Sequence, residues 1–225
     1  GRQTINLDNQ RFVGTVAWRQ NDQTFDAVSL NYKPCKEFGL FYSYIDQVNT
    51  IFGSEEPEPK FIQAQASKQE SKIHLIQAKM NYDPLLNAVV YGYLMDFEDL
   101  AAWSNQTYGL RVTGKKNDFK YSAEYANQTE YADQPTDYDA DYYALELGYN
   151  ISSQSTTIGD ISIGYEVLGS DDGKIAFQTP LATKHKFNGW TDMFLTTPAN
   201  GLKDLYITSN FNIFSKGKLG TELHQ

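Results

Sequence analysis

The feature that most constrains the fold of this chain is an alternation of polar and apolar residues that recurs in segment after segment. Successive side chains of a β-strand point to opposite faces, so this period of two predicts strands with one apolar and one polar face. About ten such strands can be counted, and no long amphipathic helix interrupts them. The clearest strands are Thr107–Lys115, Phe119–Gln128, Tyr142–Asn150, Asp160–Val167 and Leu205–Ile213.

The character of these segments favours a membrane barrel. Most are near the 9–11 residues that a tilted membrane strand needs, and only one face of each is apolar. The alternative is a soluble β-sandwich, whose solvent-facing positions usually carry more charge than these do. The segment Leu86–Phe97 is apolar on both faces, and the alternation does not assign its sides.

Tyrosines recur near the strand ends. A tyrosine ring tolerates apolar contact while its hydroxyl stays wet, which is what the aromatic girdles of membrane barrels require. The simpler explanation is that tyrosine favours strands in general. The girdle candidates are Tyr82, Tyr91, Tyr93, Tyr125, Tyr143, Tyr149 and Tyr165.

The predicted connections differ in length. Short turns on one rim and long loops on the other are typical of outer-membrane barrels. We therefore predict an all-β fold, an antiparallel transmembrane outer-membrane β-barrel, here a partial barrel of about ten strands with long loops on one rim. Short helical turns are expected within Phe97–Ser104 or Pro198–Leu202. The short turns are Pro34–Cys35, Asp83–Leu85 and Lys116–Asp118, and the long loops are Gly53–Ser71, Gln128–Asp141 and Gly169–Gly201.

The ends of the 225-residue chain lie within the pattern, since it opens on Gly-Arg-Gln and stops at Glu-Leu-His-Gln. We expect one β-barrel domain over residues 1–225 that is incomplete at both ends. No apolar run approaches the roughly 20 residues of a spanning helix. The net charge of −9 argues against a nucleic-acid partner, because phosphate binding needs clustered Lys and Arg.

The opening stretch, residues 1–20, carries three arginines and few residues that suit a dry core. We expect it to supply one wall strand and a polar turn or inward fold that presents its guanidinium groups to an aqueous interior. The alternative is a strand and loop of a soluble β protein with arginines on its surface. A guanidinium fork matches a carboxylate bidentately, so lumenal arginines would attract anionic solutes.

Seven basic residues are candidates for lining a solute path. Arg111, Lys115 and Lys120 fall on the polar faces of neighbouring strands, which would let them set selectivity in a lumen. The alternative is structural pairing, since Glu124 and Glu166 fall on polar faces too and opposite charges on facing strands attract. Glu146 and Asp160 offer further partners. The pore-lining candidates are Arg2, Arg11, Arg19, Lys79, Arg111, Lys115 and Lys120.

The long loop near residue 185 is a candidate constriction. A tryptophan beside polar donors suits sugar stacking, and long loops in compact β proteins are often functional, although a packed extracellular loop is the alternative. The Asp137–Asp141 run lacks the spacing of an EF-hand, so a solvated acidic loop is favoured over a calcium site. The constriction candidates are Lys184, His185, Lys186 and Trp190.

Catalysis has little support in the sequence. No Gly-x-Ser-x-Gly, phosphate-loop or paired-histidine zinc motif is present, so we expect no enzyme, no cofactor and no metal. Carboxylates are plentiful, which keeps open a soluble carbohydrate-binding β-sandwich or a polysaccharide-degrading enzyme. A third possibility is a structural or adhesive barrel whose lumen is plugged by the opening segment.

Two stretches resemble a known family. GRQTINLDNQRFVGTVAWRQNDQTFDAVSL (residues 1–30) and KHKFNGWTDMFLTTPANGLKDLYI (residues 184–207) are similar to bacterial outer-membrane proteins of the alginate export family. The resemblance implies a large antiparallel barrel in the outer membrane of Gram-negative bacteria, with a polar, often arginine-lined lumen. The expected function is a porin-like channel for anionic or polar solutes. The expected partners are outer-membrane lipid, lipopolysaccharide and a solute such as a uronate polysaccharide.

Overall fold

The chain folds into a single curved sheet of eleven antiparallel strands, in which all but one neighbouring pair is consecutive in sequence. A computed structural model describes residues 1–52, 66–153, 156–188, 191–214 and 217–224. Among these residues, no helix has the length and apolar character needed to cross a membrane. A three-residue 3-10 helix, η2 (Ala101–Trp103), lies between β5 and β6, within the span where a helical turn was predicted.

The sheet order is β1-β2-β3-β4-β5-β6-β7-β8-β9-β12-β13, and β10 and β11 form a separate two-stranded ribbon. The strands are β1 (Arg2–Gln3), β2 (Thr24–Tyr32), β3 (Phe38–Asn49), β4 (Lys68–Asn81), β5 (Asn87–Phe97), β6 (Asn105–Lys116), β7 (Phe119–Glu130), β8 (Asp139–Ser153), β9 (Thr156–Leu168), β10 (Ser170–Asp171), β11 (Ile175–Ala176), β12 (Leu202–Phe214) and β13 (Gly217–His224).

The convex face of the sheet is apolar and uncovered. Val28 is 71% exposed and Leu147 is 65% exposed, although both lie in mid-strand. In a sandwich these side chains would be buried against a second sheet, and the described residues place no sheet over them. The exposed apolar face is therefore the lipid-facing surface that the alternation predicts. Other exposed members of this face are Leu30, Leu40, Ile76, Met80, Val90, Leu110, Leu145, Ile161, Ile163, Leu205 and Ile207.

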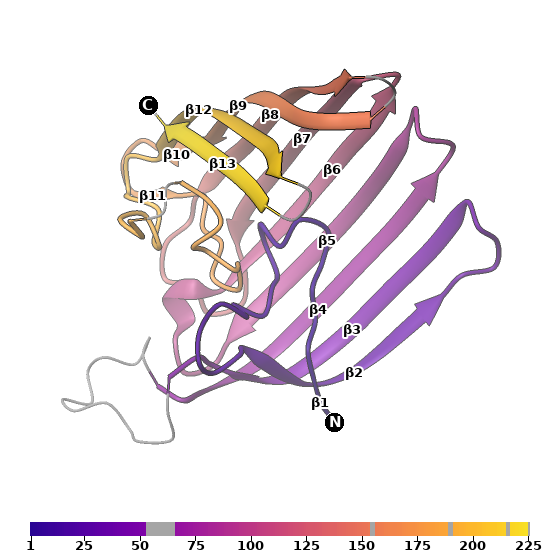
Figure 1. The fold of residues 1–225 in the computed structure, drawn as a ribbon. Helices are drawn as coiled ribbons and strands as arrows, with labels where there is room; N and C mark the ends of the chain where they lie inside the picture. Colours follow the sequence, from indigo (N-terminus) through magenta and orange to yellow (C-terminus); the bar gives the residue numbers. More distant parts are fainter. Residues whose placement is uncertain (53–65, 154–155, 189–190, 215–216, 225) are drawn as a thin grey trace.

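Two segments fold onto the concave face of the sheet (Figure 1). The first, residues 4–23, leaves β1 and returns to the start of β2; we call it the N-terminal segment. The second, residues 169–201, joins β9 to β12; we call it the β9–β12 connection. They pair with each other, because Val13 and Leu181 form a parallel bridge and the Gly14 N–H donates to the Leu181 carbonyl at 2.9 Å.

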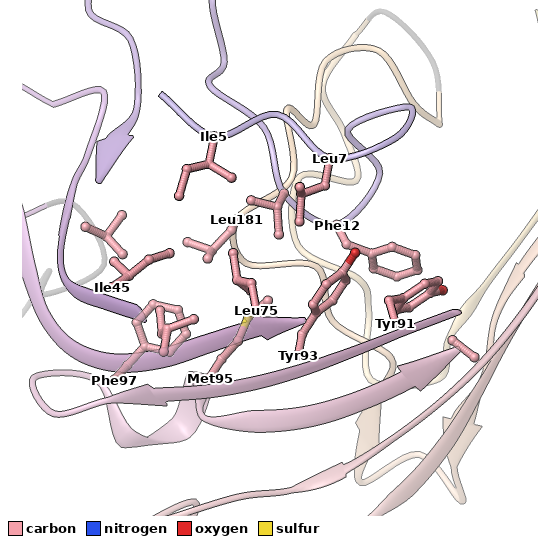
Figure 2. Close-up of a cluster of buried hydrophobic side chains, with 14 of the residues drawn as sticks. Ile5, Leu7, Phe12, Ile45, Leu75, Tyr91, Tyr93, Met95, Phe97 and Leu181 are labelled. Carbon is pink, nitrogen blue, oxygen red and sulfur yellow. The ribbon is translucent and has the colours of Figure 1, made fainter. Parts of the chain in front are cut away.

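An apolar core fills the space between these segments and the wall (Figure 2). Phe12 is at its centre, with ring centroids 5.5 Å from Tyr91, 5.2 Å from Tyr142 and 5.7 Å from Phe177. The prediction that the opening stretch has few core residues is therefore wrong. It contributes Ile5, Leu7, Phe12, Val13 and Val16, all buried.

The inner core explains why β5 reads as apolar on both faces. Tyr91, Tyr93, Met95 and Phe97 point inward and are buried under the N-terminal segment, while Val90 points outward. The assignment of Tyr91 and Tyr93 to an aromatic girdle is consequently wrong. The other five girdle candidates, Tyr82, Tyr125, Tyr143, Tyr149 and Tyr165, are exposed on the outer face.

The connections alternate as expected. The turns β2–β3, β4–β5 and β6–β7 are short and lie at one end of the sheet. The N-terminal segment, the loop from β7 to β8 and the β9–β12 connection lie at the other end (Figure 1). Since outer-membrane barrels carry their longer loops on the extracellular side, both infolded segments enter the lumen from that side.

Candidate functional site

One cross-strand row of the inner face carries most of the charge. The sheet pairing places Lys79 opposite Val89, Val89 opposite Arg111, and Arg111 opposite Glu124. The row continues through Ala144 to Glu166 and Asp204. Two cations on β4 and β6 are therefore followed by three carboxylates on β7, β9 and β12. We call Lys79, Arg111, Glu124, Glu166 and Asp204 the charged row.

The charged row borders the apolar core. The neighbouring row of inner-face residues, on the side of the long loops, runs through Gln77, Tyr91, Gly109 and Tyr142. A Cβ at Gly109 would overlap the Tyr91 ring, so the glycine lets this ring lie flat across the neighbouring strand. Tyr91 then donates its hydroxyl proton to Glu124 Oε1 at 2.8 Å, which ties the core to the charged row.

Arg11 joins the N-terminal segment to the wall. It is 3% exposed, and its Nε and Nη2 donate to the two carboxylate oxygens of Glu166 at 2.6 and 3.1 Å. Tyr142 also donates to Glu166, at 2.7 Å. Asn188 accepts from Arg11 at 3.0 Å and donates to Glu166 at 2.7 Å, which brings in the β9–β12 connection. We call Arg11, Tyr142, Glu166 and Asn188 the clasp.

The clasp satisfies a buried charge pair on all sides. The guanidinium also lies over the Phe187 ring, 4.8 Å from its centroid. Leaving either charge unpaired in such a place is strongly destabilising, because a buried ion loses its hydration. Arg11 thus faces a carboxylate rather than open water in the described structure.

The other basic candidates on the wall differ in how they are paired. Lys79 Nζ lies 3.0 Å from Asp8 of the N-terminal segment, and Arg111 Nη1 lies 3.8 Å from Glu124. Lys115 and Lys120 are exposed and directly opposite each other, nearer the short turns. These two lysines present the most accessible positive charge of the inner wall among the candidates.

The two remaining arginines lie at the rims of the N-terminal segment. Arg2 forms a two-pronged contact with Asp26 on β2, at 2.9 and 3.0 Å. Arg19 lies 4.0 Å over the Trp18 ring and 4.0 Å from Asp192. A role for either in the solute path stays a prediction.

The predicted constriction residues lie where the two infolded segments meet. The His185 ring stacks 4.2 Å from Trp18, and its Nδ1 is 2.8 Å from Asp192. Lys184 lies 5.7 Å over the Trp103 ring, and burial, followed by the nearby charge of Arg11, lowers its pKa. Trp190 lies outside the described residues.

Lys186 bridges the same two segments from the lumenal side. Its ammonium donates to the Asn9 carbonyl at 3.1 Å. Partial burial, then the charge of Arg111, lowers the pKa of Lys186, while Glu146 acts in the opposite direction. Lys186 therefore lies within electrostatic reach of both wall residues.

A cavity of 330 Å³ opens beside the clasp and the charged row. It lies between β6, β7, β8, β9 and β12 on one side and the β9–β12 connection on the other. Its lining combines basic, acidic and aromatic side chains, so it can bind polar solutes by charge and by ring contact. Among its lining residues are Arg111, Glu124, Tyr142, Glu146, Glu166, Lys186, Phe187, Asp204 and Tyr206.

The described residues contain no group of three or more His, Cys, Asp or Glu side chains arranged to hold a metal ion. Within the acidic Asp137–Asp141 run, Asp141 accepts hydrogen bonds from Tyr125 at 2.8 Å and Tyr143 at 3.1 Å. These contacts place the carboxylate at the outer aromatic girdle.

Sequence reasoning missed two members of the clasp. Tyr142 opens the predicted strand Tyr142–Asn150, but nothing in the pattern distinguishes it from the other tyrosines. Asn188 adopts a positive φ of 57°, a conformation that asparagine tolerates better than most residues. An asparagine in a long loop signals such a turn, but not the partner 22 residues away that it meets.

Taken together, a single up-and-down sheet with an apolar outer face, a polar inner face and loops folded into the lumen defines an outer-membrane β-barrel channel fold. A family model described as alginate export matches residues 1–171. The chain therefore belongs to the alginate export family, and it is a protein of the bacterial outer membrane.

Solved structures agree on the fold. The chain superposes on OpdL of Pseudomonas aeruginosa with a TM-score of 0.68 at 14% identity, covering 98% of this chain and 58% of that one. For OprD of Pseudomonas aeruginosa the values are 0.61, 13%, 97% and 52%. For the outer membrane channel DcaP of Acinetobacter baumannii they are 0.56, 12%, 100% and 63%. The chain thus spans between half and two thirds of each of these structures. A search of curated proteins found no match.

Proposed function

We propose that this chain forms part of an outer-membrane channel that passes polar solutes, including anionic ones such as a uronate polysaccharide. The observation that carries the proposal is the exposed pair Lys115 and Lys120, which lies on the inner face of the wall between the charged row and the short turns. A pore lined by fixed charges raises the local concentration of complementary solutes and sets ionic selectivity.

The different positions of the basic residues support this proposal. Arg11 holds the two infolded segments together through the clasp, whereas Arg111, Lys115 and Lys120 face the lumen. Anion attraction is therefore assigned to the wall lysines and Arg111 rather than to Arg11. The infolded segments narrow the path beside them and so define which solutes fit.

The direct test is conductance of the full-length protein in planar bilayers, with ion selectivity measured from the reversal potential in a salt gradient. We expect an open channel whose preference for anions falls when Arg111, Lys115 and Lys120 are changed to glutamine. The matched control is Lys72→Gln, because Lys72 faces the outer surface of β4, where it pairs with Glu98. Unchanged selectivity in the lumenal variants, or an equal change in the control, would remove these residues from the mechanism.

A second function, a structural or adhesive barrel with a plugged lumen, is favoured by the apolar core between the N-terminal segment and β3–β5. Such packing would let the N-terminal segment act as a plug. Absence of any conductance from a correctly folded, full-length sample would support this second function over the channel.

A further inference from the structure

The cavity beside the clasp is lined by charges of both signs. Lys186 of the β9–β12 connection supplies a positive charge and Glu146 of β8 a negative one. Arg111 and Asp204 also line the cavity, but Arg111 lies 3.8 Å from Glu124, and Asp204 is buried and accepts from Asn188 at 3.4 Å. On the wall, Arg111 of β6 precedes the carboxylates of β7, β8, β9 and β12 in the sheet order, so the two signs of charge are separated across the cavity. A solute inside it would experience a field along the wall.

Two further carboxylates of the cavity are neutralised by the protein itself. Glu166 is paired with Arg11 and accepts from Tyr142 and Asn188. Glu124 accepts from Tyr91 and lies 3.8 Å from Arg111. The charge offered to a solute therefore comes chiefly from Lys186 and Glu146.

The remaining groups have the geometry to receive a solute. The Lys186 ammonium donates one hydrogen bond to the Asn9 carbonyl and has three donors in all. Glu146 accepts from the Tyr206 hydroxyl through Oε2 at 2.9 Å, which fixes its carboxylate across Gly164. A Cβ at Gly164 would overlap the Tyr206 ring, so this approach depends on the glycine.

Aromatic rings supply the walls between the charges. The cavity is lined by Phe187, Tyr142 and Tyr206. The Lys186 Nζ atom lies 5.6 Å from the centroid of the Phe187 ring. The volume of 330 Å³ is at the small end of the range for small-molecule sites. The lining therefore combines apolar ring surface with groups of opposite charge.

We propose that this cavity binds a small solute that carries both a cationic and an anionic group, with the anion toward Lys186 and the cation toward Glu146. The inference rests on the proposed channel function and narrows its solute class at this cavity. A polyanion would meet Glu146 and a simple cation would meet Lys186, so each would lose part of its attraction by repulsion.

The test compares three molecules with the same four-carbon chain: 4-aminobutanoate, butanoate and butylammonium. Binding to the detergent-solubilised full-length protein is followed by ligand-observed NMR, which does not depend on conduction, and block of current is followed in planar bilayers. We expect 4-aminobutanoate to bind at least about tenfold more tightly than either singly charged analogue, because it gains a second ion pair.

Variants assign the site. Glu146→Gln and Lys186→Gln should each reduce 4-aminobutanoate binding by about tenfold, since each removes one of the two ion pairs. Lys186→Gln should weaken butanoate more than butylammonium, and Glu146→Gln the reverse. Lys186 is exposed on the connection, so its variant is expected to fold even if Glu146→Gln does not. Lys72→Gln on the outer face is the matched control and should leave all three molecules unaffected.

The outcomes separate the two proposals. Equal binding of the three molecules, or tighter binding of a uronate trisaccharide than of 4-aminobutanoate, would overturn the solute class even if the channel conducts. Selective binding by NMR in a protein that shows no conductance would keep the site and overturn the channel. Binding that survives in both variants would place the solute elsewhere and overturn the inference.

Discussion

The inner wall of this sheet has two contrasting regions. Toward the long loops, Leu75, Tyr93 and Phe97 are buried under the N-terminal segment in an apolar core. Toward the short turns, the same wall presents Lys115 and Lys120, which are exposed. The outer face is apolar along both regions. Where a membrane strand is apolar only on its outer face, its inner face contacts water in the lumen. Where a strand is apolar on both faces, as β5 is, its inner face is covered by a segment that packs into the lumen.

The largest expected effect comes from the clasp, which joins the two regions. Arg11→Met leaves Glu166 buried without its cation, and loss of one partner of such a pair costs about 3–5 kcal/mol. The N-terminal segment should then undock locally. Hydrogen exchange of the Gly14 and Thr183 amides, which bond across the two infolded segments, would report the loss.

The paired variant Arg11→Met/Glu166→Met is the control, since replacing both charges by apolar side chains is often neutral. It should recover most of the amide protection lost in the single variant. If these amides exchange equally fast in both variants, the charge pair does not hold the two infolded segments together. The apolar packing around Phe12 would then be responsible.

A smaller effect compares a leucine in the inner core with a leucine on the outer face. Leu181→Ala should destabilise docking of the β9–β12 connection by about 2–5 kcal/mol, because it leaves a cavity in a packed core. Leu147→Ala faces lipid, which can refill the space. Amide exchange of residues 4–23 should rise in the first variant and stay unchanged in the second; a similar rise in both would show that the two regions are not distinct.

The smallest effect concerns Lys184 and pH. Burial lowers the pKa of this lysine below its ordinary value of 10.5, so the undocked segment binds a proton more readily than the docked one. The free energy of docking therefore becomes more favourable as pH rises from the lowered pKa toward 10.5. At pH values below the lowered pKa, this contribution is absent. Lys184→Gln should flatten this dependence in an exchange experiment across pH, and an unchanged slope would contradict the assignment.

Much of the outer wall could be predicted from the sequence. Alternation assigned Leu145, Ile163 and Leu205 to the apolar face, and each is exposed on the convex side of the sheet. It also placed Arg111, Glu124 and Glu166 on the inner face, where they form ion pairs. A period of two fixes the face of every residue once one is known, which is why these predictions are confirmed.

The lumenal packing could not be predicted in the same way. Ile5, Leu7 and Phe12 lie in an irregular segment without a period, so no pattern indicates that they are buried. Tyr91 and Tyr93 looked like girdle residues because alternation alone cannot tell which apolar face of a two-sided strand meets lipid. The partner of Arg11 lies 155 residues away, a separation that local spacing does not reveal.

The distance along the chain between Arg11 and Glu166 also bears on the order of assembly. Neighbouring strands of the wall pair after short turns, whereas the N-terminal segment reaches its carboxylate partner only when β9 is already in place. Long-range contacts close late because the chain entropy must be lost first. The barrel should therefore pass through a hollow intermediate, in which the wall is complete and its interior is still unoccupied by the folded segments.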